Sequence, residues 1–74
     1  MAKPEIETPE PGDLLIRHRG SGYDVERVRE DGLFEPVFGP TPAFATAVTI
    51  ARETNPEARI LRTRDDGGYE EVDQ

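Results

Sequence analysis

The chain has 74 residues, enough for one small domain, and its formal net charge is −7 at pH 7. Hydrophobic and charged residues each make up 34% of the chain, so any hydrophobic core must be thin. The absence of cysteine excludes disulfides and thiolate chemistry. Since no apolar run approaches the ~18 residues that span a membrane, and residues 1–5 do not resemble a signal peptide, we expect a cytoplasmic protein.

The acidic residues gather near the two ends of the chain, whereas residues 14–64 are almost neutral. An acidic chain repels nucleic acid at long range, because phosphate binding needs a clustered basic surface. We therefore expect no nucleic-acid binding unless arginines form a local patch.

Residues 1–12 are rich in proline and glutamate, and Ile6 is their one large aliphatic residue. Such a segment buries too little apolar surface to offset the entropy lost on ordering. We predict a disordered leader over residues 1–12 and a single small domain over residues 13–74. Deleting the leader is then expected to leave the melting temperature nearly unchanged. The functional alternative is a docking peptide centred on Ile6.

Residues 14–19 and 23–29 alternate in polarity around a glycine-rich turn, which is typical of a β-hairpin. A two-residue Gly20-Ser21 loop sets the register of the two strands. The expected pairs are Ile16 with Val25, Arg17 with Asp24, and His18 with Tyr23. Val28 has the opposite parity to Val25, which predicts a bulge near Glu26–Arg27.

A third strand is expected over residues 33–38, and Pro36 places it at a sheet edge because proline cannot donate to a ladder. Thr41 is expected to cap a helix that ends at Asn55-Pro56. Residues 58–64 and 69–72 complete the set of strands. A two-residue Asp66-Gly67 turn between them pairs Leu61 with Val72, Arg62 with Glu71 and Arg64 with Tyr69.

These elements predict an α+β fold with the order β-β-β-α-β-β, in which one helix packs on a mainly antiparallel sheet. A right-handed crossover through the helix places the fourth expected strand beside the first. Counted in chain order, the five strands then lie in the order 3-2-1-4-5. The expected core is Leu14, Ile16, Val25, Val28, Phe38, Phe44, Ala47, Val48, Ala51 and Leu61.

Three motifs that could carry chemistry have simpler interpretations. Gly20-Ser21-Gly22 lacks the third glycine and the following helix of a dinucleotide loop. His18 is the only histidine and is expected to pack on Tyr23, with no oriented nucleophile. Asp65-Asp66-Gly67-Gly68 is too close to the chain end to form a calcium loop. We therefore predict no enzymatic activity, no cofactor and no metal site.

Arginines dominate the basic residues, and six of them fall on expected strands. Four of these form a candidate anion-binding face of the sheet: Arg17, Arg19, Arg62 and Arg64. The expected registers argue against an anion site, because they place Arg17 opposite Asp24 and Arg62 opposite Glu71. A solvated face of self-paired charges is therefore favoured over an anion site.

The outward face of the expected helix carries no charge in its first two turns, where Ala45, Thr46 and Thr49 lie. An exposed helix normally carries more charge there. These three small residues form a candidate interface, because they allow the close approach of another surface such as a second copy. The alternative is that they simply face water.

The pattern Phe44-x-x-Ala47-Val48-x-x-Ala51-Arg52-Glu53 after a hairpin resembles two kinds of small bacterial protein. One is a family of short uncharacterised domains with strand-strand-helix-strand-strand order. The other is the HicB-type antitoxin, although the third strand here lacks that family's proline-glycine-rich segment and no DNA-binding element follows. The uncharacterised family is the closer likeness.

The leading hypothesis is a non-enzymatic protein-interaction module whose partner is another protein or a second copy. One alternative is nucleic-acid or anion binding by the arginine-bearing sheet face. Another is an antitoxin-like partner of a small basic toxin, since acidic charge would steer such a partner.

Overall fold

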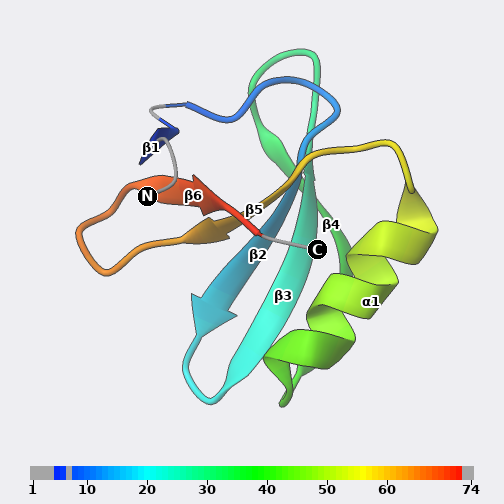
Figure 1. Ribbon diagram of the computed structural model, residues 1–74, viewed down its shortest axis with the longest axis vertical. Helices are drawn as coiled ribbons and strands as arrows, with labels where there is room; N and C mark the ends of the chain where they lie inside the picture. Colours follow the sequence, from blue (N-terminus) through cyan, green and yellow to red (C-terminus); the bar gives the residue numbers. More distant parts are fainter. Residues whose placement is uncertain (1–4, 7, 73–74) are drawn as a thin grey trace.

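The structure, a computed structural model, describes residues 5–6 and 8–72, which form one helix packed on one mixed sheet (Figure 1). The elements are β1 (Glu5–Ile6), β2 (Leu14–Arg19), β3 (Gly22–Val28), β4 (Phe34–Thr41), α1 (Phe44–Thr54), β5 (Ile60–Thr63) and β6 (Tyr69–Glu71). The strand order is β1-β6-β5-β2-β3-β4. The α+β class and the predicted order of five strands are confirmed, and β1 is an additional strand.

The hairpin of β2 and β3 has the predicted register, because a slip of one residue would turn its apolar side chains to the wrong face. Ile16 lies opposite Val25, Arg17 opposite Asp24 and His18 opposite Tyr23. The predicted bulge near Glu26–Arg27 is wrong for this hairpin, since its ladder is continuous. The irregularities lie instead between β3 and β4.

The centre of the sheet is a parallel pair in which Leu14 lies beside Ile60 and Leu15 beside Leu61. Successive side chains of a strand alternate between the two faces of a sheet, so a strand buried on both faces is continuously apolar. Leu14, Leu15 and Ile16 are all buried for this reason.

The hydrophobic core on the helix side brings two alanines of α1 against the central strands. It consists of Leu14, Ile16, Val25, Ala47, Ala51 and Ile60, with Phe44 and Val48 partly buried against them. Leu15, Val28 and Leu61 are buried outside this cluster, on the opposite face by alternation. The predicted core missed Leu15 and Ile60, and it was wrong for Phe38, whose exposed fraction is 44%.

Two predicted turns differ from the structure. The helix N-cap is Ala43 without a side-chain hydrogen bond, and Thr41 instead ends β4. The β5–β6 loop is one residue longer than predicted: the Arg64 amide donates to Gly68 at 2.8 Å. Only Gly67 takes a positive φ in this loop, whereas a two-residue type I′ turn would need one at Asp66 as well.

The longer loop shifts the register of β5 and β6 by one residue. Arg62 therefore lies opposite Glu70 and not Glu71, and Thr63 replaces Arg64 opposite Tyr69.

The position of β4 at the sheet edge is as predicted from Pro36. The helix, at 11 residues, is too short to cross a membrane.

The described part of residues 1–12 lies against the sheet. Glu5 and Ile6 pair with Glu70 and Tyr69 of β6. Pro9 is buried, and the amide of Gly12 donates to the Val28 carbonyl at 2.9 Å. Deletion of residues 1–12 measures how much these contacts contribute to the stability of the fold.

Candidate functional site

The four candidate arginines do not share one surface. In the parallel pair, Arg62 lies beside Ile16 and therefore faces the helix side of the sheet. Arg17 and Arg19, which have the opposite parity in β2, face the other side. The structure thus brings Arg17 and Arg19 together, and separately Arg62 and Arg64.

Carboxylates from β3 engage the pair on the face away from the helix. Arg17 Nε lies 3.2 Å from Glu26 Oε1, and Arg19 lies 2.9 Å from Asp24 and 3.5 Å from Glu26. The partner predicted for Arg17, Asp24, thus pairs with Arg19 instead. The Arg17 guanidinium also lies 5.3 Å from the ring centroid of Phe34. Two cations meet two anions here, so this face presents no excess of positive charge.

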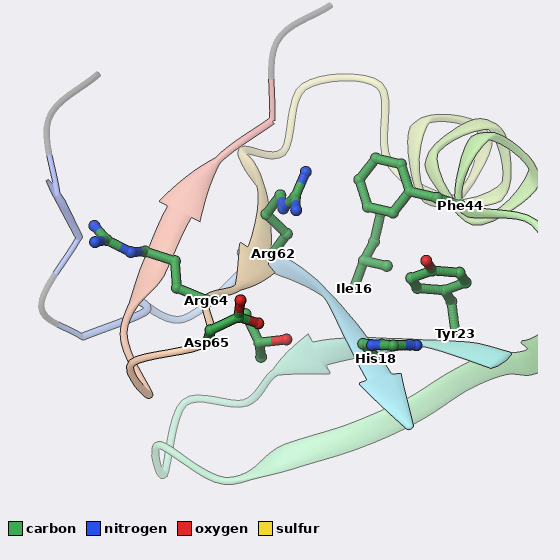
Figure 2. Close-up of a pocket in the computed structure, with 8 residues that line it drawn as sticks. Ile16, His18, Tyr23, Phe44, Arg62, Arg64 and Asp65 are labelled. Atoms are coloured by element: carbon green, nitrogen blue, oxygen red, sulfur yellow. The ribbon is translucent and has the colours of Figure 1, made fainter. Parts of the chain in front are cut away.

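The second pair of arginines lines a cavity of about 450 Å³ on the helix side of the sheet (Figure 2). We call it the β2–β5 cavity, because it lies beyond the point where these two parallel strands stop pairing. Its lining residues are Ile16, His18, Tyr23, Phe44, Arg62, Thr63, Arg64 and Asp65.

Three aromatic rings form one wall of the cavity. His18 stacks on Tyr23 with ring centroids 4.8 Å apart, and Tyr23 meets the edge of Phe44 at 5.5 Å. Such offset and edge-on contacts suit the charge distribution of aromatic rings. The pairing of His18 with Tyr23 was predicted from the hairpin, whereas Phe44 was assigned to the core alone.

Two arginines line the cavity next to this aromatic wall. The Arg62 guanidinium lies 5.1 Å from the centroid of Phe44, and its Nε lies 3.3 Å from Glu70. Arg64 pairs with Asp66 at 2.9 Å and projects away from the aromatic wall in Figure 2. Arg62 is thus the cation that faces the rings.

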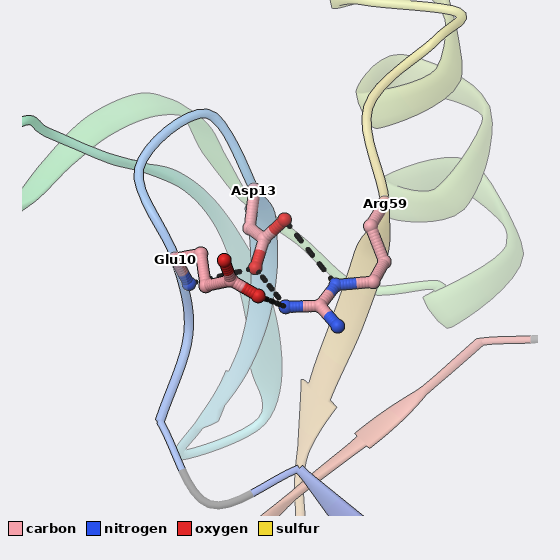
Figure 3. Close-up of polar contacts among 3 residues, drawn as sticks. All are labelled: Glu10, Asp13 and Arg59. Carbon is pink, nitrogen blue, oxygen red and sulfur yellow. Dashed lines mark hydrogen bonds and ion pairs between the residues drawn. The ribbon is translucent and has the colours of Figure 1, made fainter.

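A separate ion pair joins the starts of the two central strands (Figure 3). Asp13, 7% exposed, accepts hydrogen bonds from Arg59 Nη2 at 2.6 Å, Arg59 Nε at 3.3 Å and the Glu10 amide at 2.8 Å. The side-chain hydrogen bond with Asp13 raises the pKa of Arg59, against the opposing effect of burial. This contact ties the chain before β2 to the chain before β5.

Sequence reasoning missed this ion pair, although a signal for it was present. Asp13 immediately precedes β2 and Arg59 immediately precedes β5. The predicted strand order makes these two strands parallel neighbours, so opposite charges just before them should meet.

The other candidate surface is the outer face of α1, where Ala45, Thr46 and Thr49 are exposed. The hydroxyl of Thr49 donates to the Ala45 carbonyl at 3.1 Å, a bond within the helix itself. A second candidate was not predicted: three large apolar side chains on and just before β4 are exposed. They are Leu33, Val37 and Phe38, with exposed fractions of 60%, 36% and 44%. We call them the β4 patch.

Among residues 5–6 and 8–72, no three histidine, aspartate or glutamate side chains converge in a way that could hold a metal ion. The chain matches no family model, no curated protein and no solved structure. The resemblances drawn from the helix pattern therefore stay predictions.

Proposed function

We propose that the protein is a non-enzymatic interaction module that self-associates through the β4 patch. The observation that carries this proposal is the exposure of three large apolar side chains, Leu33, Val37 and Phe38, along one edge of a very small domain. All three lie within six consecutive residues, and exposed apolar groups concentrated in one segment are characteristic of interaction sites. A second copy would cover them and add to a thin core, which within residues 8–72 has nine buried hydrophobic residues.

The backbone of β4 favours contact through side chains over the addition of another strand. Pro36 and Pro40 have no amide hydrogen to donate to a neighbouring strand. The pairing of β4 with β3 also shifts register at two places, which makes the edge irregular. We therefore expect an interface of packed apolar side chains and not a continuous sheet across two copies.

The outer face of α1 is the competing interface, and charge-introducing variants separate the two surfaces. Phe38→Glu places a carboxylate in the β4 patch, and Thr49→Glu places one on the helix. Ser21→Glu, in the exposed hairpin turn, is the control with the same added charge. Sedimentation velocity from about 1 µM to about 1 mM covers the affinities expected of a modest interface.

The proposal predicts that the wild-type protein and Ser21→Glu form dimers, whereas Phe38→Glu stays monomeric. If Thr49→Glu dissociates the dimer and Phe38→Glu does not, then the interface is the helix face and the β4 assignment is wrong. A wild-type protein that remains monomeric over the whole range would contradict self-association by either surface.

A further inference from the structure

We propose that the β2–β5 cavity binds a planar aromatic ligand with a single negative charge, such as an aromatic carboxylate. This activity is additional to self-association and uses different residues. Three features of the cavity carry it: its position in the sheet, its wall of aromatic rings, and the charge balance around Arg62.

The cavity exists because the two central strands separate. The parallel ladder ends where Ile16 lies beside Arg62, after which β2 continues to Arg19 and β5 ends at Thr63. Beyond this point β5 turns away with β6 while β2 stays with β3 (Figure 1). Ligands often bind where neighbouring strands separate at their carboxyl ends. The volume of about 450 Å³ is within the range of small-molecule sites.

The aromatic wall sets the preference for a planar ring. His18, Tyr23 and Phe44 already contact one another in stacked and edge-on geometries, and all three border the cavity. His18 is exposed, and Tyr23 and Phe44 are only half-buried, so part of this aromatic surface is open to a ligand. A further ring would extend the cluster by the same contacts and would displace water from apolar surface.

The charges around the cavity limit the ligand to one negative charge. Arg62 is half exposed; its Nε lies 3.3 Å from Glu70, and its guanidinium lies over the Phe44 ring, so a carboxylate bound between them would meet the N–H donors at the edge of the guanidinium. The other charges oppose further anions: Asp65 lines the cavity, and Arg64 is engaged by Asp66. Adenosine monophosphate, whose phosphate carries about 1.5 to 2 negative charges at pH 7, is therefore disfavoured relative to a monocarboxylate.

The test is a titration followed by amide chemical shifts in ¹⁵N–¹H NMR spectra. The probe is indole-3-acetate, which joins a planar ring to one carboxylate. Neutral indole and adenosine monophosphate serve as comparison ligands that lack the charge or carry too much of it. We expect saturable shifts at residues lining the cavity, with a dissociation constant of about 1 mM or lower, and at least fivefold weaker binding of both comparison ligands.

Two variants test whether indole-3-acetate binds in the cavity, and a third is a control outside it. Arg62→Met is expected to weaken indole-3-acetate binding at least tenfold, and Phe44→Leu at least threefold. Arg29→Met, which removes an exposed arginine paired with Asp31 in a distant turn, should leave binding unchanged. Because Arg62 is half exposed, its replacement should preserve the fold, which the same spectra report. Shifts that do not saturate, or that are equal in Arg62→Met and wild type, would overturn the proposal, and so would tighter binding of adenosine monophosphate.

Discussion

Replacing Asp13 with alanine tests whether the ion pair before the two central strands is a main source of stability. The substitution removes a carboxylate that accepts three hydrogen bonds, two from Arg59 and one from the Glu10 amide. It leaves the Arg59 guanidinium, whose side chain is 27% exposed, without its nearest counter-charge.

The magnitude follows from the burial of the two partners. Breaking a fully buried ion pair costs about 3–5 kcal/mol, because the remaining charge is left uncompensated. Arg59 keeps some contact with water, so part of this cost is recovered by hydration. We expect Asp13→Ala to lower the free energy of unfolding by about 2–4 kcal/mol. A domain of this size has a total stability of about 4–11 kcal/mol, so the change is large.

Chemical denaturation of wild type, Asp13→Ala, Arg59→Ala and the double variant measures this value and the coupling between the two residues. The coupling is expected to be about 1–3 kcal/mol, since the residues are in direct contact. The control is Glu35→Ala, which breaks the exposed cross-strand pair with Arg27 and should cost less than about 1 kcal/mol. If Asp13→Ala costs no more than Glu35→Ala, the reasoning from burial is refuted.

Three further predictions address the termini, the edge strand and the charge. Deleting residues 1–12 should lower the melting temperature by more than about 5 °C, because it removes buried Pro9 and a hydrogen bond to β3. An unchanged value in calorimetry would support the disordered leader expected from the sequence. Gly39→Ala should destabilise the fold by at least about 2 kcal/mol, since φ is +127° and a Cβ atom would lie 2.6 Å from an Asp24 oxygen; Gly67→Ala, which meets no such contact, should cost clearly less in the same denaturation assay. Labelled single-stranded RNA and duplex DNA should show no binding at physiological salt in fluorescence anisotropy, because the net charge is −7. Micromolar affinity lost in Arg17→Ala would contradict this last expectation.

The parts of the fold that sequence reasoning predicted correctly are those controlled by strong alternation of polarity. A one-residue slip of the hairpin would put Ile16 and Val25 on opposite faces, which excluded that register. The crossover rule then placed the fourth expected strand beside the first. The register of β5 and β6 was wrong because glycines at positions 67 and 68 permit more than one loop length. There the alternation of the short strand β6 was too weak to decide between them.

The candidate sites were harder to predict because they depend on which face of the sheet each residue occupies. Arg17 and Arg62 lie on neighbouring strands, yet they point to opposite faces because the parallel register places Ile16 beside Arg62. That register is a tertiary property that no local pattern contains. Phe38 is exposed for a different reason: it lies opposite the buried Val25, as alternation suggests, but β4 is the last strand of the sheet and leaves its outer side open to water.

The parallel pairing at the centre of the sheet has a consequence for how the chain folds. Asp13 and Arg59, which meet at the start of this pairing, are 46 residues apart in the sequence. The β2–β3 hairpin can form locally within about 1–10 µs, but closing a loop of that length is slower and costs more entropy. Until residues 60–63 arrive, one edge of β2 has no partner and part of its apolar surface is uncovered. During synthesis, the protein is therefore most exposed to pairing with other chains just before its last two strands are made.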